Sequence, residues 1–316
     1  MKYRVIKLHF QSSVHFGDGL LESAKLNLAA DTLFSAICHE ALAQEGIAGI
    51  DFLVDSVRDG LLKISDAFPF INQMMLLPKP AEMIRSSDIS DTDDSSAKKM
   101  FKKLHYLPLQ ELKKYLAGSM SQDECKKDLE LIHTLGKSFL KTNVRIYDGM
   151  DKDADPYYVG GFRFAEGCGL WFLVCTENEQ IMQKCIELIH SLGYSGLGGK
   201  RSSGYGRFIA EAEEPEPELL AMLEGKAERY MTLSVALPKE DELEAAIEDA
   251  SCVVMQRTGF VGSDTFADCP QKKRDMYLFS SGSCFSHVFA GDVYDVSNGG
   301  NHPVYRYAVP LMLRVR

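Results

Sequence analysis

The chain has 316 residues, which exceeds the size of most single domains, so we expect two domains of about 100 to 200 residues each. Its 45% hydrophobic and 25% charged residues are ordinary for a folded protein and exclude a globally disordered chain. Its formal net charge of -10 excludes a general polyanion binder, because non-specific nucleic-acid binding needs excess Lys and Arg. Any nucleic-acid site must therefore be local.

The first residues, MKYRVIKLHF, alternate polar and apolar side chains, which predicts a strand over residues 2–10. They lack the unbroken apolar core of a signal peptide. No apolar run reaches the roughly 18 residues that a membrane-spanning helix needs. We therefore expect a cytoplasmic protein.

The cysteine and histidine spacings do not indicate a metal site. The eight cysteines contain no CxxC pair, and no two histidines lie at the i, i+4 spacing of a helical zinc site. In the reducing cytosol the cysteines would serve as small core side chains. We expect no protein-held metal and no cofactor.

The elements of the first half follow from the spacing of apolar residues. After a loop that contains Gly17, a helix is predicted to begin at Asp31, its N-cap, and to stop at Gly46. A short helix should cover residues 52–58, and strand-like sequence covers residues 61–70.

The middle of the chain continues with an insertion and a hairpin. Residues 85–99 are polar and nearly free of apolar side chains, which predicts a surface insertion or a disordered loop. Residues 144–164 read as two aromatic strands joined by an Asp-rich turn, which predicts a protruding hairpin. A buried strand over 169–175, a helix that ends at Gly193 and a strand over 205–210 should follow.

The order strand, helix, strand, strand, helix, strand is that of a ferredoxin-like unit, which many RNA-binding modules use. Residues 211–220 mix prolines with glutamates and are typical of a domain boundary. The second half repeats the rhythm, with a strand over 229–237, a helix opened by Pro238 near its N1 position, and a strand over 252–260.

We therefore predict an α+β fold made of two tandem ferredoxin-like domains. The first would span residues 1–212, with an insertion at about 81–140 and a hairpin at about 142–164, and the second would span residues 213–316.

A glycine-rich loop, residues 193–208, carries the strongest functional signal. It reads GYSGLGGKRSSGYGRF and contains six glycines, the cations Lys200, Arg201 and Arg207, and no acidic residue. Glycines let backbone N–H groups approach phosphate oxygens, and Lys and Arg supply the opposite charge. The composition favours a polyanion site, although a plain turn between a helix and an edge strand is the alternative.

The spacing within this loop narrows the choice of polyanion. A Walker A pattern that ends at Gly199 and Lys200 would need glycine at 194 and Ser or Thr at 201, where the chain has Tyr194 and Arg201. The dinucleotide pattern fails at Arg201 as well, since it would need glycine there. SGYGRF only partly matches the motif of RNA-recognition sheets, because Ser203 and Arg207 replace the expected basic and aromatic residues.

The loop GLGGKRSSGYGRF closely resembles the glycine-rich loop of RAMP proteins, the repeat-associated RNA-binding subunits of CRISPR systems. A succession of blocks along nearly the whole chain resembles, more specifically, the fourth subunit of the Csm complex of subtype III-A: VHFGDGLLES, AADTLFSAICHEA, LLPKP, KKLHYLPL, DPYYVGGFRF, GSCFSHVFAGDVYDV and NHPVYRYAVPLMLRV.

The resemblance implies a five-subunit ribonucleoprotein of antiviral defence, in which this chain caps the 5′ repeat-derived tag of the CRISPR RNA (crRNA). It implies two protein partners, the large polymerase-like subunit on one side and the backbone RAMP subunit on the other. It also implies that the chain is not an enzyme, because target and DNA cleavage belong to those two partners.

The resemblance further implies a set of RNA-binding residues. The loops would hold the phosphates and sugars of the tag through His15, Gly17, Gly196, Gly198, Gly199, Lys200, Arg201, Ser202 and Ser203. The hairpin would displace a base where the tag meets the guide, through Arg145, Tyr147, Tyr157 and Tyr158. Aromatic residues of this kind stack on bases, although ordinary sheet packing is the alternative for Tyr157 and Tyr158.

Two other functions stay open on the sequence. A RAMP endoribonuclease could process precursor RNA with His15 as its acid or base, whereas a loop histidine held by the backbone needs no chemistry. A pure assembly protein would make RNA contacts only incidentally. The run QKKRD at 271–275 could contact RNA or an acidic partner, and Asp31 is read as a helix cap rather than a catalytic acid.

Overall fold

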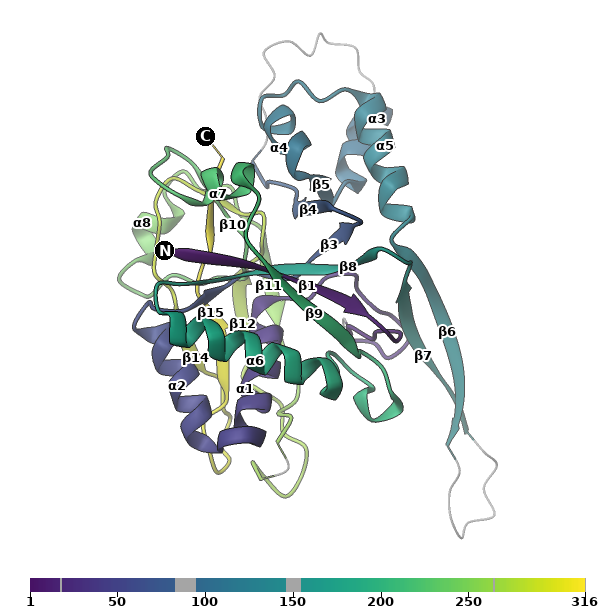
Figure 1. Cartoon of the computed structure of the whole chain (residues 1–316), viewed down its shortest axis with the longest axis vertical. Coiled ribbons are helices and arrows are strands. Elements are labelled where there is room, and N and C mark those ends of the chain that lie inside the picture. The colour runs from purple at the N-terminus through teal and green to yellow at the C-terminus, as the bar shows by residue number, and fades with distance from the viewer. Residues whose placement is uncertain (18, 83–94, 146–154, 264, 316) are drawn as a thin grey trace.

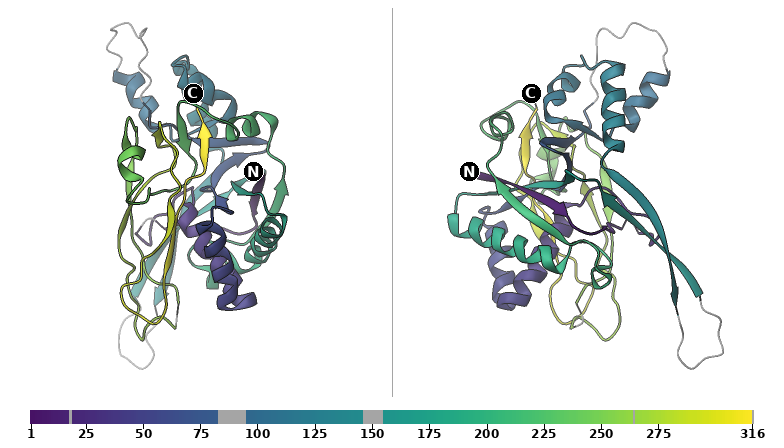
Figure 2. Two further views of the ribbon diagram at one scale, coloured as in Figure 1. Left: turned by 90° about the vertical axis from the view of Figure 1, so that its left-hand side faces the viewer. Right: turned by 45° about the vertical axis from the view of Figure 1, so that its right-hand side comes forward.

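The computed structural model describes residues 1–17, 19–82, 95–145, 155–263 and 265–315 (Figure 1). A mixed α/β body carries two outgrowths, a group of helices at one edge and a long two-stranded ribbon that extends away from the body (Figures 1 and 2). No helix in these described ranges is long and apolar enough to cross a membrane.

The body is built on a seven-stranded sheet in which every described pair is antiparallel. Its order is β5-β4-β3-β8-β1-β9, with β2 also paired to β8. The strands are β1 (Lys2–Phe10), β2 (Lys63–Ile64), β3 (Phe68–Ile71), β4 (Met74–Pro78), β5 (Tyr106–Pro108), β8 (Cys168–Thr176) and β9 (Phe208–Glu213). The predicted first strand is confirmed.

The strand expected over residues 61–70 is interrupted between β2 and β3. At the break, Ser65 Oγ accepts a hydrogen bond from the backbone N–H of Leu173, and the buried Asp66 carboxylate accepts two further backbone N–H groups. At this point side-chain oxygens accept backbone N–H groups that would otherwise pair between strands. The segment therefore pairs with β8 as two short strands, β2 and β3.

Both faces of the sheet are buried. Because side chains alternate across a strand, Leu170 and Phe172 of β8 enter one core, whereas Trp171 and Leu173 enter another. This double burial explains why β8 is apolar throughout. The first core lies beneath α1 (Ala30–Glu45), α2 (Ile47–Arg58) and α6 (Glu179–Ser195).

The start of α1 differs from the prediction. Ala29 is the N-cap residue, and Asp31 lies in the first turn, where its carboxylate is bound by Arg257 and Arg306 instead of capping the helix. The backbone N–H of Ala30 donates instead to Asp66 Oδ1 at 2.8 Å. Gly46, with φ of 69°, separates α1 from α2, which begins earlier than the expected residue 52.

The second core lies on the opposite face of the sheet. It is closed by α7 (Pro217–Leu223), by strands of the second half and by helices of the insertion, which are α3 (Ser95–Lys103), α4 (Leu109–Leu116) and α5 (Gln122–His133). The polar segment expected at 85–99 lies mostly outside the described residues. Its last part belongs to α3 rather than to a loop.

The second half consists mainly of short strands. They are β10 (Tyr230–Thr232), β11 (Val254–Arg257), β12 (Met276–Phe279), β13 (Cys284–Phe285), β14 (Asp292–Asp295), β15 (Tyr305–Ala308) and β16 (Met312–Arg314). They form one three-stranded sheet, β13-β10-β16, and the pairs β11-β12 and β14-β15.

The predicted start of the helix at Pro238 is wrong. Helix α8 covers only Leu243–Ile247. Before it, the Glu242 carboxylate accepts backbone N–H groups from Lys239, Ala290 and Gly291. These bonds hold the preceding segment as a turn against the loop before β14, so the helix cannot extend back to the proline.

The expected hairpin is the ribbon of β6 (Gly136–Arg145) and β7 (Asp155–Phe164). Its first strand begins at Gly136, earlier than the predicted residue 142. Near the body, Val14 forms a bridge with Phe162 of β7, which ties the ribbon to the loop after β1.

Candidate nucleic-acid interface

The glycine-rich loop leaves α6 and folds against the loop that follows β1. Leu197 N–H donates to Gly206 O, which closes the loop on itself, and Gly206 N–H donates to Ser13 O at 2.8 Å. Gly199 N–H donates to His15 O at 2.9 Å. The backbone of the loop is therefore held by the segment that carries His15.

Two glycines are required by this close approach. Gly198 has φ of 90°, and a Cβ at this position would lie 2.8 Å from His15 O. At Gly206, φ is 78°, and a Cβ would overlap Leu197 O. Side chains rarely adopt this left-handed backbone, so both positions favour glycine for conformation and for space.

His15 lies beneath the loop and is buried, with 7% exposure. Its Nδ1 donates a hydrogen bond of 2.7 Å to Gly160 O on β7, because a carbonyl can only accept. A Cβ on Gly199 would lie 2.7 Å from the His15 ring, and one on Gly17 would lie 3.5 Å from Nε2. The imidazole thus joins the ribbon to both loops.

The cations of the loop point in different directions. Lys200, with φ of 60°, places Nζ 5.6 Å from the centre of the Tyr157 ring. Arg201 begins a single 3-10 turn with Ser202 and Ser203, and all three are exposed. Arg201 also lines a cleft in front of the loop.

The ribbon presents two different faces. Tyr157 and Tyr158 are adjacent in β7, so their side chains lie on opposite faces, and only Tyr157 faces the glycine-rich loop. The ring of Tyr205 lies 6.4 Å from Phe139 on the same face. The other face carries three exposed apolar side chains: Leu140, Val144 and Tyr158.

A further predicted residue, Arg145, lies at the end of the described part of the ribbon. Arg145 is exposed and pairs in register with Asp155 at the end of the described ladder. Tyr147 lies outside the described residues. The structure therefore brings the loop residues, His15, Gly17 and Tyr157 together, and it places Arg145 and Tyr158 away from that centre.

A cleft of about 380 Å³ opens in front of the glycine-rich loop. One wall is formed by the loops around His15 and Gly198 and by the first turns of α1. The opposite wall comes from the second half, through Met255, Arg257, Phe260, Gly262 and Lys273. Sequence reasoning missed this wall, except that Lys273 lies in the basic run at 271–275.

The charged side chains that line the cleft are all basic among the described residues: Lys25, Arg201, Arg257 and Lys273, with His15 and His39 beside them. Arg257 is matched by Asp31, which it binds through two hydrogen bonds of 2.9 and 2.6 Å. On a chain with a net charge of -10, this local excess of cations suits an anionic ligand.

The cations of the cleft also act on one another. Burial lowers the pKa of His39, and the neighbouring Arg201 and Lys273 charges lower it further. Burial likewise lowers the pKa of Lys273, and the Arg306 charge adds to this effect. A phosphate bound in the cleft would relieve this repulsion, since it favours the charged forms.

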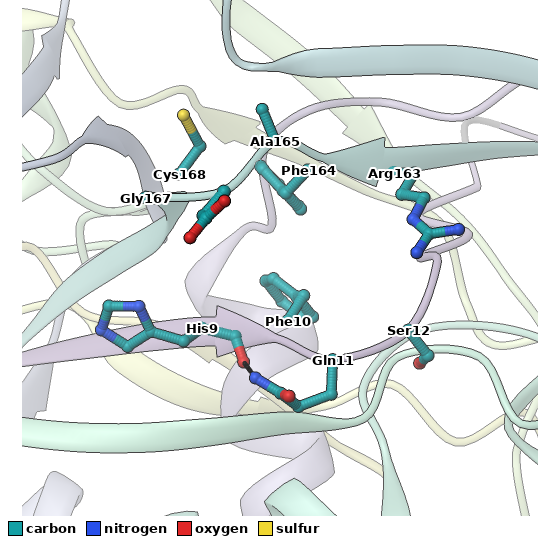
Figure 3. A pocket seen from close by; sticks show the side chains of 10 residues that line it. His9, Phe10, Gln11, Ser12, Arg163, Phe164, Ala165, Gly167 and Cys168 are labelled. Atoms are coloured by element: carbon teal, nitrogen blue, oxygen red, sulfur yellow. Dashed lines mark hydrogen bonds between the residues drawn. The ribbon is translucent and has the colours of Figure 1, made fainter.

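A second pocket of about 280 Å³ lies where β1 ends beside the turn between β7 and β8 (Figure 3). Phe10 and Phe164 stack at its centre, with ring centres 5.1 Å apart, and Gln11 donates back to His9 O. The pocket contains none of the predicted site residues. The cationic cleft is therefore the better candidate for a ligand site.

Comparison with known proteins identifies relatives of this chain. A family model, the CRISPR Csm4 C-terminal domain, matches residues 225–315. The protein of Mycobacterium tuberculosis named CRISPR system Cms protein Csm4 is 40% identical over 314 residues, which cover 99% of this chain and 98% of that protein.

Solved structures share the fold along the whole chain. One is the Csm3-Csm4 subcomplex in the type III-A CRISPR-Cas interference complex, with a TM-score of 0.67, 18% identity and 99% coverage of both chains. Another is the Csm1-Csm4 cassette in complex with cA4, with a TM-score of 0.65, 20% identity and coverage of 100% and 98%.

These relatives belong to the class of CRISPR-associated proteins, and this chain shares their mixed α/β fold. In this chain that fold carries the cationic cleft. Within that class the chain belongs to the Csm4 family.

Proposed function

We propose that this chain is the Csm4 subunit of a type III-A CRISPR effector complex and that it binds the 5′ repeat-derived tag of the crRNA. The observation that carries the RNA role is the cleft in front of the glycine-rich loop, whose charged lining residues are basic in the described part of the chain. Lys200 and Arg201 of the loop supply the cationic groups that phosphates prefer.

The proposed protein partners follow from the assemblies in which similar chains were solved. One similar structure is a Csm3-Csm4 subcomplex, and another is a Csm1-Csm4 cassette. We assign these as the backbone RAMP subunit and the large polymerase-like subunit of the complex formed by this chain. An acidic chain with one local basic cleft can dock on basic subunits without attracting RNA over its whole surface.

The proposed role is non-catalytic, and the chain acts by holding RNA and linking subunits. His15, the candidate for an endoribonuclease, is buried and donates its Nδ1 proton to Gly160 O. This contact supports a positioning role beneath Gly198 and Gly199. The enzyme alternative requires that purified protein cut repeat RNA and that His15→Ala abolish the cut.

The proposed architecture is that of the RAMP family, with ferredoxin-like units. In the first half, the central order β3-β8-β1-β9, with α1 and α6 on one face, supports this arrangement. The second half has short strands and the five-residue helix α8, so its ferredoxin-like character rests on the family resemblance.

The direct test removes the two loop cations. The double variant Lys200→Ala/Arg201→Ala should bind tag RNA more weakly, and its salt slope should fall by about 0.7 for each lost phosphate contact with a single strand. Affinity is measured by fluorescence anisotropy at several salt concentrations. Lys126→Ala/Lys127→Ala, which changes two exposed lysines of α5, is the matched control.

Comparison of these two double variants distinguishes an RNA-binding role from a role in assembly alone. If the loop variant keeps the affinity and the salt slope of the control, the chain does not bind RNA through this loop. Retained assembly with partner subunits alongside unchanged RNA binding would then favour the assembly role.

A further inference from the structure

The wall of the cleft that belongs to the second half carries an exposed aromatic ring, Phe260, and a basic side chain, Lys273. Beyond β11, part of this wall is formed by two paired segments, residues 259–263 and 271–273. Val261 N–H donates to Gln271 O, and Lys273 N–H donates to Gly259 O, both at 2.9 Å. The two segments are thus joined by backbone hydrogen bonds beside Phe260 and Lys273.

Phe260 is an exposed aromatic residue on the first of these segments. Its side chain is 59% exposed and lines the cleft, and Phe260 forms a backbone bridge with Lys272. The Lys272 ammonium lies 5.8 Å from the ring centre. A large apolar ring in water, beside cations, is an arrangement that binds a nucleobase by stacking.

Lys273 provides the charge next to this ring. Arg257 lines the same wall, but its guanidinium is already bound by the Asp31 carboxylate. Lys273 is half-buried, and within the described residues its Nζ forms no hydrogen bond. Its pKa is lowered by burial and by the Arg306 charge, so an anion that entered the cleft would stabilise the ammonium.

We propose that the paired segments 259–263 and 271–273 form a nucleotide subsite for single-stranded RNA, in which Phe260 stacks on one base and Lys273 binds an adjoining phosphate. The subsite rests on the proposed RNA role of the cleft and extends it to the second half of the chain. The RNA would then lie between the two halves, with the glycine-rich loop on one side and these two segments on the other.

The test compares variants of the full chain in binding to a fluorescein-labelled single-stranded RNA that carries the repeat-derived 5′ tag. Phe260→Ala should weaken binding by about 5- to 150-fold, the range for loss of one stacked base, and should leave the salt slope unchanged. Lys273→Gln should lower the salt slope by about 0.7, because it removes one phosphate contact.

Two control variants remove an exposed aromatic ring and an exposed lysine outside the cleft. Tyr277→Ala removes a ring that is 62% exposed on β12, and Lys127→Ala removes an exposed lysine on α5. A base analogue such as 2-aminopurine in the tag gives a direct readout of stacking. Its fluorescence should be quenched by the native chain and restored in Phe260→Ala.

The outcomes distinguish the subsite from the RNA role as a whole. If Lys200→Ala/Arg201→Ala weakens binding while Phe260→Ala and Lys273→Gln match their controls, the RNA role stands and the subsite is wrong. If none of these variants differs from its control, both proposals fail. The proposal requires that the cleft bind a continuous strand of RNA. If free mononucleotides bound as tightly as tag RNA, the proposed subsite would therefore be wrong.

Discussion

Asp66 is buried, and one oxygen of its carboxylate accepts hydrogen bonds from two backbone N–H groups. Its Oδ1 accepts the N–H of Ala30 at the start of α1 and the N–H of Val235 in the second half, at 2.8 and 2.9 Å. Burial raises the pKa of this carboxyl to about 6, against an ordinary value of 3.8. The charged form is therefore disfavoured in the folded protein.

The raised pKa predicts a pH dependence of stability. Because the folded state holds the proton more tightly, this group stabilises the fold below about pH 4, and the contribution is lost as the pH rises through 6. The shift corresponds to about 3 kcal/mol at most. Asp66→Asn can keep the same acceptor oxygen, so we expect a flatter dependence of unfolding free energy between pH 4 and 7.

Denaturant unfolding at several pH values checks this expectation. Asp128, whose pKa burial also raises to about 6, is present in both proteins and cancels in the comparison. Parallel stability curves for the native chain and Asp66→Asn over this range would contradict the prediction.

At the scale of elements, the sequence predicts the strands and helices around the glycine-rich loop but not the long-range contacts that hold the loop in place. The alternation of apolar residues predicted β1, and helical spacing predicted α1 and α6. The contact of His15 with Gly160 joins residues 145 positions apart, and no local pattern signals it. The same holds for the wall that carries Phe260.

Substitution of loop glycines should show which of them the fold requires. Gly198→Ala places a Cβ 2.8 Å from His15 O at positive φ, so both strain and overlap are expected. Gly204 has a similar φ of 85°, but a Cβ there would meet no atom within 4 Å, so Gly204→Ala should cost only about 1 kcal/mol of backbone strain. Thermal unfolding and tag-RNA binding measure the difference.

The pair of glycine variants carries its own control. Gly198→Ala should lower both stability and RNA affinity more than Gly204→Ala, because it displaces the His15 backbone. If the two variants lost equal stability and equal RNA affinity, the loop would accommodate a Cβ at Gly198 without displacing His15, and the prediction would be wrong.

At the scale of the whole molecule, one ionic cluster joins the two halves. Asp31 in α1 is bound by Arg257, 226 residues away, and by Arg306, 275 residues away. Such long separations explain why the sequence favoured a helix cap for Asp31. The side chains of Asp31 and Arg306 are only 6% and 4% exposed, so their charges depend on one another.

Removal of Asp31 should destabilise the whole chain. Asp31→Ala leaves the buried Arg306 guanidinium and the partly buried Arg257 guanidinium without their counter-charge, and removing one partner of a buried ion pair typically costs about 3 to 5 kcal/mol. Lys2→Ala breaks an exposed ion pair with Glu179, whose loss should change stability little because solvent screens both charges. Chemical denaturation compares the two variants, and a loss for Asp31→Ala no larger than that for Lys2→Ala would refute a structural role of the cluster.

The β6-β7 ribbon has two faces that can vary independently. Tyr157 faces the glycine-rich loop, whereas Leu140, Val144 and Tyr158 lie on the reverse, exposed to solvent. Because side chains alternate along a strand, a substitution at one position alters a single face. Mutational drift that remodels one surface of the ribbon therefore leaves the opposite surface intact, so the ribbon can acquire new contacts on one side while it retains those on the other.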